Sequence, residues 1–378
     1  MEYMTGALND GTTPYSRFKE NEGKVISIKG AIHNIRDMSD FAFIILRTAR
    51  ELIQCVYSPE FSDYRMADNV VEQASAKITG KVVKSQTRDG SERFEIQIHN
   101  IEILSTPAAI PPVVISKKKV NCDLNVDLDF RPVTLRNPSE RAVFKIQEGI
   151  QRGFREHLMN NGFTEIHTPK INFAGAEGGT NVFKLDYFGK TVFLAQSPQL
   201  YKQALVPVYE RVFEIAPVFR AEHHDTSRHL NEYISMDFEM GFIDSFTDIM
   251  EMETGVLKYI MDLLKREYAP EIELLKVEIP EVDKIPCIRF KDAKELCVKK
   301  LKNITDMKDF EPEEEAFLGK WAKQQYGSDF LFVTHYLSKK RPFYTMDDPE
   351  DPEVTLSFDL LFRGIEITSG GQRIHDYN

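Results

Sequence analysis

The sequence predicts an α+β protein in which a small N-terminal β-barrel precedes a larger domain of antiparallel strands and helices. Three observations predict this fold class. Short strand-like segments fill residues 21–105, an amphipathic helix follows Asn137, and two long runs alternate apolar and polar residues between 213 and 240. A chain of 378 residues, 42% of them hydrophobic, can bury the cores of two domains.

Five segments between residues 21 and 105 indicate β-strands, because Gly, Asn, Asp and Ser punctuate them. They are GKVISIKGAIHNIRD, FAFIILRTA, LIQCVYS, SAKITGKVVKSQ and RFEIQIHNIEIL. Such closely spaced strands predict a small closed barrel, with the OB-fold as the first candidate. We expect this domain at residues 1–105. The proline- and lysine-containing stretch STPAAIPPVVISKKK then indicates a hinge at 106–136, and the larger domain covers 137–378.

A long helix is predicted to open the larger domain. Asn137 can cap it, Pro138 suits its first position and Gly162 suits its end. The apolar stripe at helical spacing is Val143, Ile146, Ile150, Phe154 and Leu158. FTEIHTPKI then predicts a strand broken by Pro169. Residues 265–350 are charged and irregular, and we expect only an inserted subdomain there.

Composition narrows the class of protein. A net charge of −11 and a pI near 5.4 argue against nonspecific nucleic-acid binding, although basic patches such as SKKK at Ser116–Lys119 leave room for a specific partner. No apolar run reaches the ~18 residues of a membrane span, and the N-terminus does not resemble a signal peptide. The four cysteines are widely spaced and form no C-x-x-C pair, which predicts neither a zinc site nor disulfides and favours a cytoplasmic location.

The stretch FRAEHHDTSRHLNEYISMDFEM, from Phe219, combines this alternation with an unusual set of charges. The alternation predicts two antiparallel, half-buried strands joined by the turn-like HHDTS. Their polar face would carry Arg220, Glu222, Asp237 and Glu239. Such a face would only pair off or repel itself unless a ligand needs both types of charge.

Three other stretches place polar residues in a strand-like context: AEGGTNVF, QSPQLYKQ and SFDLLFRGIEITSGGQRIHD. Each is a weak signal alone. Glu177 could belong to a flexible turn, Lys202 could be a surface lysine, and Asp359 and Glu366 could be solvated acids at strand ends. Their coexistence in one chain is much more specific.

Together these stretches resemble the class II aminoacyl-tRNA synthetases. Pro169 after the long helix resembles motif 1, and FRAE…RHLNE resembles motif 2. QSPQLYKQ and GIEITSGGQRIHD are similar to the aspartyl-tRNA synthetases of archaeal and eukaryotic type, and the similarity extends from about Gly23 to Asn378. The resemblance implies a catalytic domain with an antiparallel sheet flanked by helices, and a homodimer formed through motif 1. It also implies that ATP activates L-aspartate to aspartyl-adenylate, which is then transferred to tRNA(Asp).

The family's motif 3, a glycine-rich strand and helix with an arginine for ATP, is expected after GGQRIHD, whereas this chain stops at Asn378. We therefore expect an incomplete catalytic domain that binds ATP weakly and activates aspartate poorly or not at all.

The resemblance assigns roles to individual residues. Arg220 would meet the α-phosphate and the substrate carboxylate, Glu222 the adenine amino group, and Arg228 with His229 the distal phosphates. The implied ATP set is Arg220, Glu222, Arg228, His229, Leu230 and Glu366. The implied aspartate set is Glu177, Gln199, Lys202, Arg220, Ser369 and Arg373. Asp359, Glu366 and Ser369 would hold Mg²⁺, since carboxylate and phosphate oxygens suit that ion.

In the barrel, Arg36, Phe43 and Gln54 match positions that read anticodon bases in the family. Phe43 lies within FAFIILR and could equally be a residue of the barrel core. An aromatic residue on the barrel surface can instead stack on a base.

Three alternatives remain at this point. An asparaginyl-tRNA synthetase is disfavoured because a neutral amide would leave Lys202 unpaired in a closed pocket. A non-catalytic RNA-binding paralogue is favoured by the missing motif 3 and disfavoured by the ATP, metal and aspartate residues. An ATP-dependent amidating enzyme of related fold is disfavoured by the N-terminal barrel.

Overall fold

The structure, a computed structural model, describes residues 11–62, 68–86, 92–173, 175, 182–222, 230–301, 304 and 306–377. The chain divides into two compact units, Met1–Arg141 and Ala142–Asn378. Because the division falls inside a helix, the predicted domain limits after residues 105 and 136 stay predictions. No helix within the described residues is long and apolar enough to cross a membrane.

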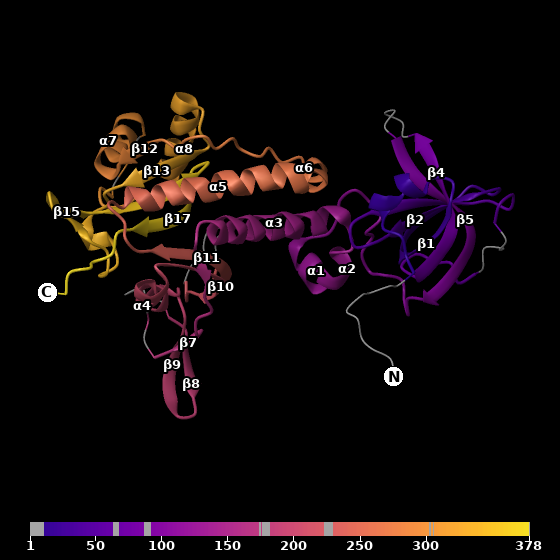
Figure 1. The fold of residues 1–378 in the computed structure, drawn as a ribbon, viewed down its shortest axis with the longest axis horizontal. Helices are drawn as coiled ribbons and strands as arrows, with labels where there is room; N and C mark the ends of the chain where they lie inside the picture. Colours follow the sequence, from indigo (N-terminus) through magenta and orange to yellow (C-terminus); the bar gives the residue numbers. More distant parts are fainter. Residues whose placement is uncertain are drawn as a thin grey trace. The chain divides into compact units, whose positions relative to one another are not determined.

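The first unit contains a closed five-stranded barrel, which confirms the predicted OB-fold (Figure 1). Its strands are β1 Val25–Asp37, β2 Ala42–Arg47, β3 Leu52–Tyr57, β4 Ser75–Gln86 and β5 Glu92–Ser105, in the order β1-β2-β3-β5-β4. Alternate residues such as Ala42, Ile44 and Leu46 are buried in its interior. Two 3₁₀ turns, Tyr15–Arg17 and Lys19–Asn21, precede the barrel, and α1 Leu124–Asp129 and α2 Arg131–Thr134 follow it.

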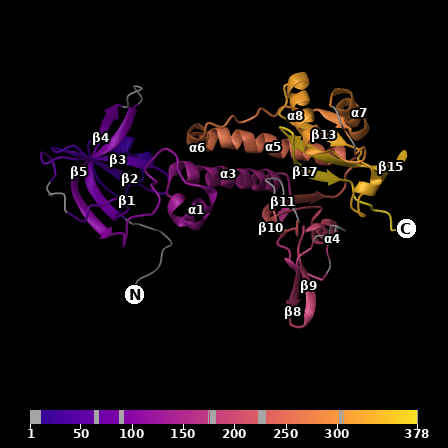
Figure 2. The same ribbon diagram turned by 180° about the vertical axis from the view of Figure 1, so that it is seen from behind.

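The predicted long helix is α3, Pro138–Asn160. The backbone N–H of Ser139 donates to Asn137 Oδ1 at 2.9 Å, and Gly162 after the helix has φ +80°, so both predicted ends are confirmed. Phe154 and Leu158 pack against α5, Thr247–Glu267, and the two helices run side by side in both views (Figures 1 and 2). The stripe prediction is wrong at Val143, which is 54% exposed because it precedes the part of α3 that α5 covers.

The predicted antiparallel pair is β10 Arg211–Phe219 and β11 Glu232–Met240, which together with β6 Thr164–Glu165 form a sheet in the order β11-β10-β6. Pro169 separates β6 from β7, as predicted. The small sheet beside them contains β7 Ile171–Asn172, β8 Lys184–Tyr187 and β9 Lys190–Leu194, and α4 Gln199–Tyr209 follows it. The predicted HHDTS turn lies outside the described residues.

A second sheet has the order β12-β13-β16-β17. Its strands are β12 Cys287–Arg289, β13 Phe330–Thr334, β16 Ser357–Phe362 and β17 Ile365–Gly371. The remaining elements are α6 Ala269–Leu275, α7 Phe290–Lys300, α8 Pro312–Tyr326, the 3₁₀ turn Ser338–Lys340, and the pair β14 Asp347–Asp348 and β15 Asp351–Thr355. The expectation that residues 265–350 form an inserted subdomain is wrong, because fully buried β13 pairs with β16 at the centre of this sheet.

Candidate active site

A cavity of about 390 Å³ in the second unit collects most of the predicted aspartate- and ATP-binding residues. Its lining includes Gln199, Lys202, Arg220, Glu222, Ser369 and Arg373 from the predicted sets, and Ser197, Ser235, Asp237, Arg341 and Tyr344 in addition. Of the other five predicted residues, Glu177, Arg228 and His229 lie outside the described residues, and the exposed Leu230 and Glu366 line a larger hollow beside this cavity. Side chains separated by up to 174 positions therefore meet in one hollow.

The first turn of α4 points Gln199 and Lys202 inward. Residues three apart share one face of a helix, and these two side chains are 1% and 7% exposed. Gln199 is held at both ends, because its backbone N–H donates to Ser197 Oγ at 3.2 Å and its Nε2 donates to Gln203 Oε1 at 3.2 Å. The second contact leaves Gln199 Oε1 free to accept from across the cavity.

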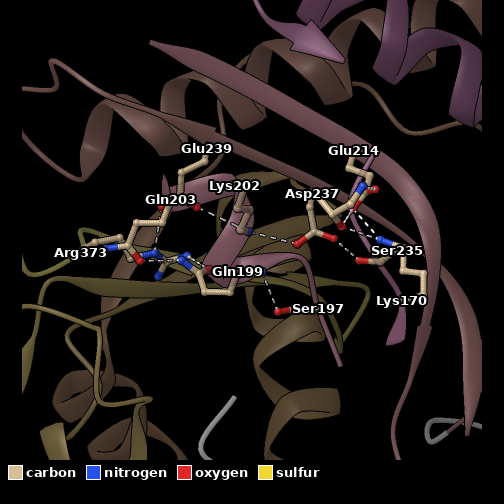
Figure 3. Close-up of polar contacts among 11 residues, drawn as sticks. Lys170, Ser197, Gln199, Lys202, Gln203, Glu214, Ser235, Asp237, Glu239 and Arg373 are labelled. Atoms are coloured by element: carbon tan, nitrogen blue, oxygen red, sulfur yellow. Dashed lines mark hydrogen bonds and ion pairs between the residues drawn. The ribbon is translucent and has the colours of Figure 1, made fainter. Parts of the chain in front are cut away.

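An alternating set of charges crosses the cavity floor (Figure 3). Lys202 Nζ lies 3.0 Å from Asp237 Oδ1 and 3.5 Å from Glu239 Oε2, both on β11. Arg373 Nε lies 3.2 Å from Glu239 Oε1, and its Nη2 donates to Gln199 Oε1 at 3.0 Å. Ser235 Oγ donates to Asp237 Oδ2. The polar face of β11 predicted from alternation is therefore present, and two basic residues from elsewhere in the chain pair with it.

These contacts fix the charge states on the floor. Burial acts to lower the pKa of Lys202, but Asp237 and Glu239 outweigh it and hold the pKa above its ordinary value. Burial likewise acts to raise the pKa of Asp237, but Lys202 and Ser235 hold it below its ordinary value. Both groups are therefore charged at neutral pH, in a site that excludes most solvent.

Arg220 and Glu222 lie at the point where β10 ends. The backbone N–H of Arg220 donates to Asn231 O at 3.0 Å, and the Arg220 guanidinium lies 5.7 Å from the centre of the Tyr233 ring. Its Nε is buried and has no hydrogen-bond partner among the described residues. A buried guanidinium donor without an acceptor is costly, so this group is suited to an anionic ligand.

Asp359 and Ser369 face each other across the β16–β17 ladder, with Glu366 further along β17. Arg341 Nη2 lies 2.7 Å from Asp359 Oδ2, whereas Oδ1 is buried without a partner among the described residues. Burial raises the pKa of Asp359, and Arg341 offsets part of this rise. Glu366 is exposed at the surface of a larger neighbouring hollow, where partial desolvation and then the Asp359 carboxylate raise its pKa to about 8.

The unpartnered Asp359 oxygen and the repulsion between the two carboxylates fit a bound cation. The described residues contain no group of three or more His, Cys, Asp or Glu side chains that could hold a metal, so a cation here would need oxygens from its substrate.

A larger hollow of about 1340 Å³ adjoins this floor and is lined by β11, β17 and α5. Both β11 and β17 are edge strands of their sheets within the described residues. Ile234 and Met236 are 45% and 38% exposed, and both line the hollow, so the apolar face of β11 is less buried than its alternation predicts. Glu253, on α5, is 5% exposed, and its Oε2 has no partner among the described residues.

The three predicted base-reading residues share the outer face of the barrel in the first unit. Arg36 pairs with Phe43 across β1 and β2, and Gln54 lies two residues from Val56, the partner of Phe43 on β3. Phe43 is partly exposed between the buried Ala42 and Ile44, so it does not belong to the core. Its ring packs edge-on against Phe41 at 5.2 Å, and Gln54 Nε2 donates to Glu95 Oε2 at 2.7 Å.

Sequence reasoning missed Arg341 and Tyr344 as lining residues. Both lie in KKRPFY, inside the stretch that could not be assigned, and no local pattern marks them. Asp237 and Glu239 were recognised on the polar face, but their pairing with Lys202 and Arg373 depends on contacts between distant segments.

The barrel and the second unit with its mixed-charge cavity define an aminoacyl-tRNA synthetase of class II. Residues 26–104 match the model of the OB-fold nucleic acid binding domain, and residues 123–378 match the model of the class II tRNA synthetases (D, K and N). The chain belongs to this family.

Individual proteins and solved structures that resemble this chain are members of the same family. The chain is 45% identical to the aspartate–tRNA(Asp/Asn) ligase of Deinococcus radiodurans, over 95% of this chain and 82% of that protein. It is 36% identical to the aspartate–tRNA(Asp) ligase of Pyrococcus horikoshii, over 95% of this chain and 83% of that protein. Its fold is similar to the crystal structure of the Pyrococcus horikoshii asparaginyl-tRNA synthetase with asparaginyl-adenylate, with a TM-score of 0.84 and 26% identity over 95% of this chain and 82% of that one.

Proposed function

We propose that this chain is an aspartate–tRNA ligase, which uses ATP to activate L-aspartate to aspartyl-adenylate and transfers the aspartyl group to tRNA(Asp). The observation that carries the proposal is the pairing of Lys202 and Arg373 with Asp237 and Glu239 on one buried floor. On this floor the positive charges of Lys202 and Arg373 offset the negative charges of Asp237 and Glu239. Some N–H donors of the basic residues remain for a substrate carboxylate. Arg373 uses two of its five N–H groups on Glu239 and Gln199 within the described residues, so three remain for a substrate.

Aspartate has two carboxylates and one ammonium group, and the cavity offers complementary partners for each. The side-chain carboxylate would accept from Arg373 beside Lys202, and the ammonium group would face an acid such as Asp237. Gln199 would line this pocket, and Glu177, outside the described residues, would be a second acceptor for the ammonium group. Arg220, whose Nε has no acceptor among the described residues, would meet the substrate carboxylate and the α-phosphate of ATP.

For the reaction, Arg220 would stabilise the negative charge that grows on the α-phosphate as the aspartate carboxylate attacks it. Glu222 would accept from the adenine amino group. Leu230 would border the nucleotide, and Arg228 and His229 would hold its distal phosphates. Asp359, Glu366 and Ser369 would hold Mg²⁺, which when bound supplies charge neutralisation for the phosphates. We further propose a cytoplasmic homodimer, and anticodon reading by Arg36, Phe43 and Gln54.

An asparaginyl-tRNA synthetase is the second candidate, because a solved structure with that activity has a similar fold. The prediction that a neutral amide would leave Lys202 unpaired is wrong, since Lys202 pairs with Asp237 and Glu239 without a substrate. The two activities predict different results in one assay. With purified protein, ATP and labelled pyrophosphate, we expect that any exchange of pyrophosphate into ATP, however slow, depends on aspartate and not on asparagine. Exchange with asparagine alone would support the second candidate. Exchange with neither amino acid, together with binding of tRNA(Asp), would support a non-catalytic RNA-binding protein.

A further inference from the structure

Three arginines converge at one end of β2 in the first unit, and among the described residues the hydrogen-bond partners of Arg47 and Arg136 are neutral. Arg47 Nη1 lies 3.0 Å from His33 Nδ1, and Arg47 Nη2 donates to Gln73 Oε1 at 3.3 Å. Arg136 Nη1 donates to the same Gln73 oxygen at 3.3 Å. Arg141 Nη1 donates to the carbonyl oxygen of Thr48, the residue after Arg47, at 3.0 Å. We call Arg47, Arg136 and Arg141 the arginine cluster.

The cluster is electrostatically unfavourable in the free protein. Within the described parts of the chain, neither Arg47 nor Arg136 forms an ion pair with a carboxylate, although the protein has 59 acidic residues. Burial, and then Arg136 and Arg141, lower the pKa of Arg47 to about 10. Burial, and then Arg47 and Arg141, lower the pKa of His33 to about 4, so this ring is neutral at physiological pH and accepts from Arg47. Like charges gathered in this way favour an anion between them.

A strained residue holds the cluster together. Gln73 has φ +69°, a backbone conformation that costs energy for a residue other than glycine. Its backbone N–H donates to Ile32 O at 2.6 Å, which fixes the residue against β1. In this position its side-chain oxygen accepts from two guanidinium groups at once, and so keeps two like charges close to each other.

The N–H groups of Arg47 and Arg136 that have no partner among the described residues are suited to binding a phosphate. Arg47 uses two of its five N–H groups on His33 and Gln73, and Arg136 uses two on Pro132 O and Gln73. A planar guanidinium presents such N–H groups in pairs, which fit the oxygens of a phosphodiester. We propose that the arginine cluster binds a backbone phosphate of the RNA that the barrel recognises. The identity of that RNA as tRNA rests on the proposed function.

The position of the cluster fits this ligand. Along the β1–β2 ladder, Arg47 pairs with Ala31 at one end and Phe43 pairs with Arg36 near the other. Four residues of extended strand separate Arg47 from Phe43 by ~14 Å. One RNA molecule could therefore place bases against the Phe43 face and a phosphate at the cluster. Each contact would raise the effective concentration of the other.

The test measures the affinity of the full chain for tRNA(Asp) at several salt concentrations. Arg47→Gln and Arg136→Gln should each reduce the slope of log affinity against log salt by about one, and should weaken binding to all tRNAs to a similar extent. Arg136→Lys, which keeps the charge, should retain most of the slope. The matched control is Lys81→Gln, which removes an exposed positive charge from β4 of the same barrel and should leave the slope unchanged.

Folding and ligand identity are checked in parallel. Each variant must keep the cooperative thermal unfolding of the wild type, and inorganic sulfate should raise the Tm of the wild type more than that of Arg136→Gln. Unchanged slopes in folded variants would overturn the proposal. So would a sulfate effect without any change in the tRNA slope, because the cluster would then bind only small free anions. Reduced slopes in a protein that shows no aspartate-dependent exchange would support the cluster while refuting the proposed function.

Discussion

Arg373 Nη2 donates a hydrogen bond of 3.0 Å to Gln199 Oε1, although 174 positions separate the two residues in the sequence. The contact joins α4 to the segment after β17, across the cavity that Lys202 and Asp237 also line. Neither side chain can move without changing the charged floor, because Arg373 also pairs with Glu239. The charged floor and the packing of two distant segments therefore depend on the same contacts.

The role of Lys202 can be separated from its contribution to stability. Lys202→Met leaves Asp237 and Glu239 without their shared cation, so we expect a loss of about 3–5 kcal/mol in the free energy of unfolding and loss of aspartate-dependent exchange. The double variant Lys202→Met/Asp237→Asn removes the carboxylate that this change orphans, whereas Glu239 keeps its ion pair with Arg373. It should recover part of the stability in chemical denaturation without recovering exchange. If either variant keeps the wild-type apparent affinity for aspartate, Lys202 is not part of the pocket.

Substitutions on the outer face of the barrel should weaken tRNA binding and leave amino-acid activation unchanged. Phe43→Ala removes a ring that could stack on a base, and we expect ~1–3 kcal/mol weaker binding of tRNA(Asp). Aspartate-dependent exchange without tRNA should be unchanged. Leu104→Ala is the matched control, since Leu104 is 50% exposed on β5 and has no assigned role. Equal effects of the two substitutions on tRNA binding would show that exposed apolar area, and not base stacking, accounts for the loss.

Glu253 should make stability fall as pH rises. Burial raises its pKa in the folded protein to about 7, against an ordinary value of 4.5, so between these values the folded state binds more protons than the unfolded state. The stability contributed by this proton is fully present below about pH 4.5 and is lost as pH rises through about 7. For this one proton, the free energy of unfolding falls by at most ~1.4 kcal/mol per pH unit. Urea denaturation from pH 5 to 8 should show a shallower decline for Glu253→Gln; an identical decline would mean that Glu253 does not titrate in this range.

Magnesium binding should be coupled to a proton on Glu366. Because the pKa of this carboxyl is raised to about 8, a cation that needs it ionised must displace the proton at neutral pH. With ATP present, the Mg²⁺ concentration for half-maximal exchange should fall by up to ~10-fold per pH unit from pH 6 to 8. In Glu366→Gln, any residual exchange should need more Mg²⁺ and should lose this dependence. A dependence that survives the substitution would assign the proton to another group.

The extent to which the sequence predicts the site differs from one residue to another. The alternation around Phe213 and Phe238 predicts β10 and β11, because a half-buried strand imposes its period on the local sequence. Asp237 follows from that pattern, whereas Glu222 lies beyond Phe219, the last residue of β10. Arg341 does not, since its contact with Asp359 joins a loop to a strand 18 positions later and leaves no local pattern. The exposure of Ile234 and Met236 also escapes local reasoning, because it depends on what lies beside β11 and not on β11 itself.

The relative use of aspartate and asparagine by the wild type and by Arg373→Gln tests the central claim most directly. The measurement is kcat/KM for pyrophosphate exchange with each amino acid, alongside Tm values that confirm folding. We predict a strong preference for aspartate in the wild type. In Arg373→Gln the preference should fall by ~10–100-fold or more, almost entirely through poorer use of aspartate, because a charge-assisted pair to the side-chain carboxylate is lost. A folded Arg373→Gln protein with an unchanged ratio would contradict the account.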